Sequence, residues 1–143
     1  MSGYKKLLVL LDLSRDSEQV ALAAKKLAAC SDAAMLALHV VEFVPVEPMG
    51  ESLMPTVQIE QDLLKRSSQS LSEYIARLAL PRTTWRVEVG NTKAEILRVA
   101  AEEKVDLIVV GSHERHGLAI LVNFTEDTVL HAAPCDVLAV RLK

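Results

Sequence analysis

The stretch "TKAEILRVAAEEKVDLIVVGS", residues 92–112, joins two elements of different period. Its first half is amphipathic, and Thr92 and Glu95 have the spacing of a capping box at a helix start. Its second half, from Val105, is an apolar run that ends at Gly111. A run of this kind is typical of a strand covered on both faces, as the strands of parallel sheets are. A helix that leads into such a strand indicates a parallel α/β sheet.

The same alternation extends along the chain in both directions. Strands are predicted at residues 5–13, 34–44, 83–90, 105–112 and 135–142, and helices from Ser14, at 57–80, at 92–104 and at 125–133. The segment at 45–55 holds three prolines and is predicted to be a loop. Because strands and helices alternate throughout, the sequence predicts an α/β fold: a five-stranded parallel sheet with helices on both faces.

Two local details follow from residue type and period. Ser14 or Asp16 is predicted to cap the first helix. The strand at 83–90 alternates, which places Trp85 on the same side as Val87 and leaves a wetter face opposite.

Composition limits the possible partners and compartment. The 143 residues are 50% hydrophobic and 3% aromatic, which suits one domain, residues 1–143, with an aliphatic core. The net charge of -3 argues against a nucleic-acid or anionic-membrane partner. No apolar run is long enough to cross a bilayer, and the first one stops at Asp12 without a signal-cleavage pattern. Cys30 and Cys135 lie far apart without metal spacing and are interpreted as reduced core thiols. We therefore expect a cytoplasmic protein.

Ligand sites in such sheets lie beyond the carboxyl ends of the strands, where the strand order reverses. The turns that meet this condition are residues 12–14, 40–42, 90–92 and 111–117. Asp12 either accepts hydrogen bonds from a ribose or an adenine edge, or satisfies backbone N–H groups at a helix entry. Gly111 provides either a close backbone approach or a positive φ angle.

The histidines do not predict a metal site or a catalyst. His113 and His116 flank Glu114, but no further ligand follows at a recognisable spacing, so a solvated loop is the better interpretation. His39 lies inside an apolar strand and is predicted to be a hydrogen-bonded core residue. The sequence has no G-x-S-x-G elbow, phosphate-binding P-loop or metalloprotease helix, so no catalytic constellation is predicted.

Four segments, in this order and spacing, resemble the universal stress protein family over essentially the whole chain. They are "LLVLLDLS", "LHVVE", "GNTKAEILRVAAEEKVDLIVVGS" and "LHAAPCDVLAVRL". The resemblance implies a Rossmann-like, adenine nucleotide alpha hydrolase-like domain that dimerises, commonly through its last strand.

The resemblance also implies a test for ATP binding. Nucleotide-binding members carry Gly, two residues, Gly, nine residues, and then Gly with Ser or Thr. On this chain those positions hold Gly111, Glu114, Phe124 and Thr125. Glu114 brings negative charge toward the phosphates, and Phe124 fills space that glycine leaves open for backbone N–H groups. A weak or vestigial nucleotide site is therefore expected, with Asp12, Val40, Gly111, Ser112, His113, Gly117 and Thr125 as its residues.

Two functions remain open at this point, and a third, an electron-transfer or redox-cofactor protein, is disfavoured because neither cysteine has a reactive partner pattern. The first is a dimeric stress-response protein that acts through an unknown protein partner and has no cofactor. The alternative is an adenine-nucleotide-binding regulator, for ATP or AMP and a slow ATPase at most. It would use a distorted loop from Gly111 to Thr125 together with Asp12 and Val40, and a shifted turn could place Arg115 on a phosphate. The predicted dimer strand contains Val137, Leu138, Ala139 and Val140, since an edge strand can pair with its symmetry mate.

Overall fold

The computed structural model describes residues 3–42, 56–80, 82–113 and 131–142. The elements are β1 (Lys6–Leu10), α1 (Ser17–Ser31), β2 (Ala34–Val41), α2 (Thr56–Leu78), β3 (Thr83–Val89), α3 (Thr92–Glu102), β4 (Leu107–His113) and β5 (Asp136–Leu142). All five predicted strands and the first three helices are confirmed. The predicted loop at 45–55, and the predicted helix at 125–133 as far as residue 130, lie outside the described ranges.

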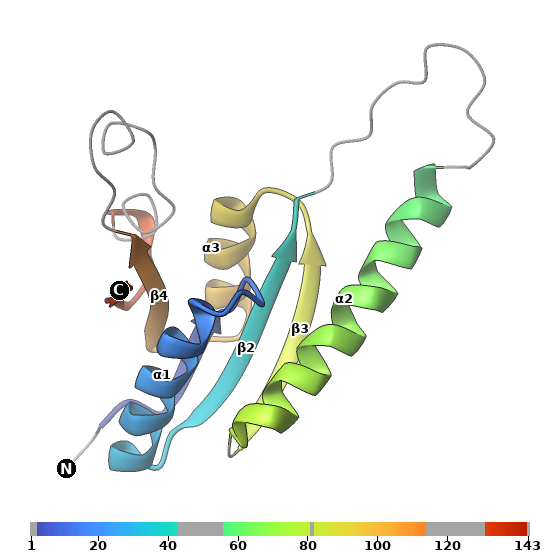
Figure 1. The fold of residues 1–143 in the computed structure, drawn as a ribbon. Helices are drawn as coiled ribbons and strands as arrows, with labels where there is room; N and C mark the ends of the chain where they lie inside the picture. The colour runs from blue at the N-terminus through green and yellow to red at the C-terminus, as the bar shows by residue number, and fades with distance from the viewer. Residues whose placement is uncertain (1–2, 43–55, 81, 114–130, 143) are drawn as a thin grey trace.

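The five strands form one parallel sheet in the order β3-β2-β1-β4-β5. The chain proceeds from β1 to β3 on one side, then crosses β1 to form β4 and β5 on the other. Figure 1 shows α2 alongside β3, at one edge of this sheet. The reversal of strand order therefore lies between β1 and β4, and ligand sites of doubly wound sheets form at such a point.

Each face of the sheet has its own aliphatic core. On one face Leu7 and Val9 of β1 pack with Val20 of α1 and Leu71 of α2. On the other face Leu8 and Leu36 pack with side chains of α3. Successive residues of β1 thus enter opposite cores, which is why its sequence is continuously apolar rather than alternating. The predicted α/β fold with helices on both faces is confirmed.

Three sequence-based details need correction. β1 ends at Leu10 rather than at residue 13, because the chain turns at Leu13, whose φ of 67° is left-handed. Trp85 is 40% exposed although Val87, on the same side of the strand, packs against the core. The alternation of residue types in β3 shows which face of the sheet a side chain points to. Because β3 is an edge strand, however, that face is incompletely covered at Trp85. Cys30 is exposed, so it is not a core thiol, whereas Cys135 is half-buried.

None of the helices in the described ranges combines the length and the apolar character needed to cross a bilayer.

Candidate functional site

Asp12 follows β1 and organises the turn into α1. Its Oδ1 accepts hydrogen bonds from Ser14 N at 2.9 Å, from Ser17 Oγ at 2.7 Å and from Ser14 Oγ. The Asp12 backbone N–H donates to Ser17 Oγ at 2.8 Å. Ser17 is only 4% exposed, so its hydroxyl is buried and satisfied within this turn. The geometry supports the helix-entry role of Asp12, and its role toward a ligand stays a prediction.

The predicted cap of α1 is only partly right. The N-cap position is Asp16, but its side chain makes no capping hydrogen bond. Ser14 Oγ instead accepts a bond from Ser17 N at 3.3 Å. Tyr74 of α2 braces the same turn, because its hydroxyl donates to Ser14 O at 3.2 Å. Burial, and next the negative charge of Glu18, raise the pKa of Tyr74 to about 12, so this donor stays protonated at neutral pH.

Two residues near the end of β2, Val40 and His39, contribute to packing and to a hydrogen bond, respectively. Val40 is half-buried and packs against the core on the α3 side. His39 Nδ1 lies 2.8 Å from Leu11 O, and a carbonyl can only accept, so Nδ1 donates. His39 is therefore hydrogen-bonded, as predicted from its place in an apolar strand, although it is half-buried rather than fully buried.

The start of α3 differs from the predicted capping box. Asn91 is the N-cap, and its Oδ1 accepts a bond from Ala94 N at 3.0 Å. Thr92 is instead bound by Glu42, whose Oε1 accepts from Thr92 N at 3.0 Å and from Thr92 Oγ1 at 2.7 Å. These two bonds lower the pKa of Glu42. The chain thus places its own carboxylate at a helix N-terminus, which attracts anions.

The contact between Glu42 and Thr92 was missed by sequence reasoning. The only signal is the position of Glu42, directly after an apolar strand. The topology then brings it to the start of α3, fifty residues later in the chain.

Gly111 is a packing glycine in the interior of β4. A Cβ at this position would lie 2.9 Å from Leu142 Cδ1 and 3.1 Å from Val20 Cγ2. Its backbone pairs with Val140 of β5, and its φ is not in the left-handed range. Of the two roles considered for Gly111, the structure supports close approach, and the groups that approach are side chains of α1 and β5.

We expect Gly111→Ala to lower the free energy of unfolding by about 1–3 kcal/mol, because overfilling a packed site forces neighbours from their rotamers. Urea unfolding measures this. Leu142→Ala removes the closest contact, so the double variant should be more stable than the sum of the two single effects predicts. A Gly111→Ala protein as stable as the unaltered chain would contradict the packing role.

Some of the remaining predicted site residues lie within the described ranges, and the others lie outside them. Parallel pairing places the ends of β1 and β4 at the same edge of the sheet, so Asp12 and Ser112 flank the reversal of strand order. Ser112 and His113 pair with Arg141 and Leu142 of β5 through the backbone. The other motif positions lie outside the described ranges; they are Glu114, Gly117, Phe124 and Thr125. Within the described ranges, no group of three His, Cys, Asp or Glu side chains is placed to hold a metal ion.

Comparison with known proteins gives one family from sequence and a shared fold from structure. The model of the universal stress protein family matches residues 3–141. Universal stress protein A homolog 2 of Coxiella burnetii is 39% identical over 100% of this chain and 99% of its own. A second protein of that organism, universal stress protein A homolog 1, is 36% identical over 98% of each chain. Universal stress protein UspA from Lactobacillus plantarum has a similar fold, with a TM-score of 0.80 at 23% identity over 99% of this chain and 100% of its own. The chain belongs to the universal stress protein family.

Proposed function

We propose that this protein, a single domain, acts in the cytoplasm as a homodimeric stress-response protein. It works through contact with a protein partner and carries no tightly bound ATP. Its membership of the universal stress protein family supports the stress-response role.

The proposal that ATP is not tightly bound rests on the sequence at the ATP-motif positions. Of the three glycine positions in the ATP motif, only Gly111 remains, and Glu114 and Phe124 occupy the others. Glycines at such turns let backbone N–H groups reach phosphate oxygens without a Cβ in the way. A carboxylate and an aromatic ring remove that access by charge and by volume.

Two contacts of the described residues agree with weak nucleotide binding. The Oδ1 atom of Asp12 is held by Ser14 and Ser17. The N-terminus of α3 is bound by the carboxylate of Glu42. Both are groups beyond strand ends that could otherwise bind a ligand, and both are already bonded within the chain. A nucleotide that used them would have to break or share these bonds.

The homodimer is supported by the composition of β5. It is an edge strand, and its charged side chains, Asp136 and Arg141, stand near its two ends. The residues between them, from Val137 to Val140, are uncharged. An uncharged edge is a template for strand pairing, and two copies related by a two-fold axis satisfy each other.

The second candidate is an adenine-nucleotide-binding regulator. It is favoured by the positions of Asp12 and Val40, which lie just beyond β1 and near the carboxyl end of β2. A universal stress protein with a TM-score of 0.69 and 20% identity, over 99% of this chain and 100% of its own, was solved in complex with cAMP. On this fold, therefore, a related chain holds an adenine nucleotide.

The test is the nucleotide content of native protein. We expect protein purified from its own cells to release far less than one adenine nucleotide per chain when it is denatured and chromatographed. The variant Glu114→Gly with Phe124→Gly, purified in parallel, is the matched comparison. About one nucleotide per unaltered chain would replace the proposal with the second candidate.

A further inference from the structure

β3 forms the edge of the sheet opposite β5, and its outward backbone groups can be assigned. Met35 N of β2 donates to Arg82 O at 3.0 Å, and Gly90 N donates to Val41 O of β2 at 3.0 Å. In a parallel ladder, alternate residues bond to the same neighbour. The even-numbered residues from 82 to 90 therefore face β2. Between these two bonds, outward N–H and C=O groups belong to Trp85, Val87 and Val89.

The residue types along this edge favour pairing with another strand. Its sequence, "TTWRVEV", is rich in β-branched and aromatic residues, which favour strands. Trp85 is 40% exposed and its backbone groups point outward. Nothing in these features alone would prevent a second chain from adding a strand here.

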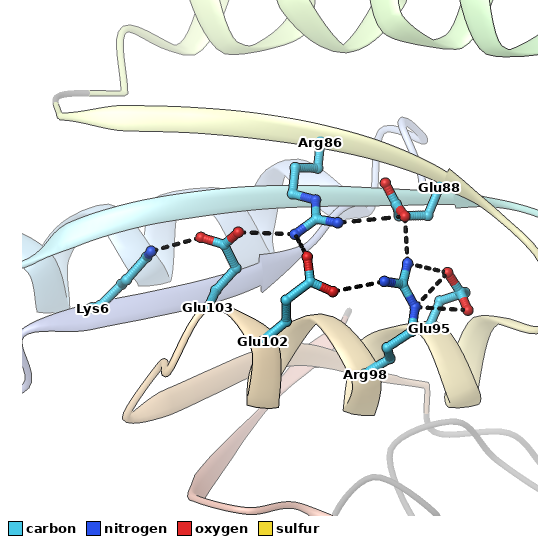
Figure 2. Close-up of polar contacts among 7 residues, drawn as sticks. All are labelled: Lys6, Arg86, Glu88, Glu95, Arg98, Glu102 and Glu103. Carbon is cyan, nitrogen blue, oxygen red and sulfur yellow. Dashed lines mark hydrogen bonds and ion pairs between the residues drawn. The ribbon is translucent and has the colours of Figure 1, made fainter.

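Two charged residues of β3, Arg86 and Glu88, form ion pairs with Arg98 and Glu102 of α3, and we call these four residues the charge ring. Arg86 contacts Glu88 at 3.5 Å and Glu102 at 3.1 Å. Arg98 contacts Glu102 at 2.8 Å and also contacts Glu88. The four side chains form a closed ring of alternating charge, which Figure 2 shows between β3 and α3. Because each member has at least two partners of opposite charge, neither Arg86 nor Glu88 can rotate away without breaking at least two contacts.

Three further side chains extend the ring. Glu95 contacts Arg98 at 2.6 Å, and Glu103 contacts Arg86 at 2.9 Å. Lys6 of β1 contacts Glu103 at 2.9 Å, so the network reaches across the sheet (Figure 2). The side chains of Arg86 and Glu88 keep 23% of their surface exposed. Both side chains belong to the edge strand, so the side chains of a strand added beside β3 would become their cross-strand neighbours.

We propose that the charge ring prevents a second chain from adding a strand beside β3, so that association through the sheet is directed to the β5 edge. A strand added beside β3 would place its side chains next to Arg86 and Glu88 and remove their water. These groups already bond each other and α3, so pairing with an uncharged strand would desolvate them without supplying a new partner. Inward charges are a known protection of sheet edges. β5 has no such charge between Val137 and Val140.

The test removes the charges on β3 and leaves the strand intact. For Arg86→Val with Glu88→Val, we expect sedimentation to give at least twice the mass of the unaltered protein. Hydrogen exchange should slow at the amides of Trp85, Val87 and Val89, which the associated state covers. Adding Trp85→Pro should return the mass to that of the unaltered protein, because it deletes an outward N–H and no bond to β2.

The matched control is Glu18→Val with Arg77→Val, which removes an ion pair of 2.6 Å between α1 and α2 and leaves the net charge equal. Its mass should not change. The proposal is overturned if the β3 double variant is folded by circular dichroism and keeps the unaltered mass. It is also overturned if association survives Trp85→Pro with no protection on β3. Where the valine pair does not fold, Arg86→Thr with Glu88→Thr is judged by the same criteria. The test depends on β3 alone, so it holds whether or not β5 forms a dimer.

Discussion

A proline at Ala139 or at Val140 is expected to abolish the dimer, and the two variants should fail in different ways. Neighbouring residues of a strand point their N–H groups in opposite directions, one toward β4 and one toward the open edge. At the outward position, proline removes a bond of the dimer interface only. At the other position it removes a bond between β4 and β5 and clashes with the ladder. We expect one folded monomer and one destabilised or aggregated protein.

Light scattering and thermal unfolding together measure this outcome. The folded variant should have the mass of a single chain and nearly the melting temperature of the unaltered protein after correction for lost dimerisation. Trp85→Pro is the matched control, because it places proline at an outward position of the opposite edge and should preserve the dimer. If both β5 variants are folded dimers, the interface lies elsewhere.

The fold was predictable because its decisive signals are local. The buried strands β1 and β4 are continuous apolar runs, and each is followed or preceded by a helix with a clear period. Parallel sheets with covered faces require that pattern. The order of the strands did not follow from the residues alone, since alternation leaves open on which side of β1 each later strand is added.

The candidate site was less predictable, because its contacts join segments far apart in the chain. Asp12 was identified by its place after an apolar run, and its partners Ser14 and Ser17 are nearby in sequence. Glu42 reaches Thr92 only because β2 and α3 meet at one end of the sheet. The packing role of Gly111 required the positions of Val20 and Leu142, on two other elements.

The charge ring illustrates the same limit. Its helical part has the spacing of ion pairs, since Arg98 is three residues after Glu95 and four before Glu102. For Arg86 and Glu88, the sequence predicts only that they lie on the more polar face of an alternating strand, and it does not predict their partners. The two sets interlock because α3 packs on the face of β1 and β2 that also carries the side chains of Arg86 and Glu88. The periodicity of each element does not reveal this arrangement.

The largest gain in ligand affinity is expected from Glu114→Gly with Phe124→Gly, which should give ATP binding that calorimetry can measure. A carboxylate about 4 Å from a phosphate costs roughly 4 kcal/mol at an effective dielectric near 20. That energy corresponds to roughly a thousandfold in Kd. Phe124→Gly adds space for the backbone to approach. Glu114→Gln removes only the repulsion, so its gain should be smaller and should be larger at low salt than at high salt.

Asp12 then decides whether the recovered binding uses the predicted site. Asp12→Ala in the double glycine background should abolish the gain. It also removes the acceptor for Ser14 and Ser17, so Asp12→Asn is needed beside it, since the amide keeps an oxygen for the turn. We expect Asp12→Asn to weaken ATP binding while the melting temperature stays close to that of the parent. Micromolar ATP binding by the unaltered protein would contradict the account, and so would a double glycine variant that gains nothing. In the second case the loop that follows β4 serves a contact other than phosphate, because neither its charge nor its volume was what excluded the nucleotide.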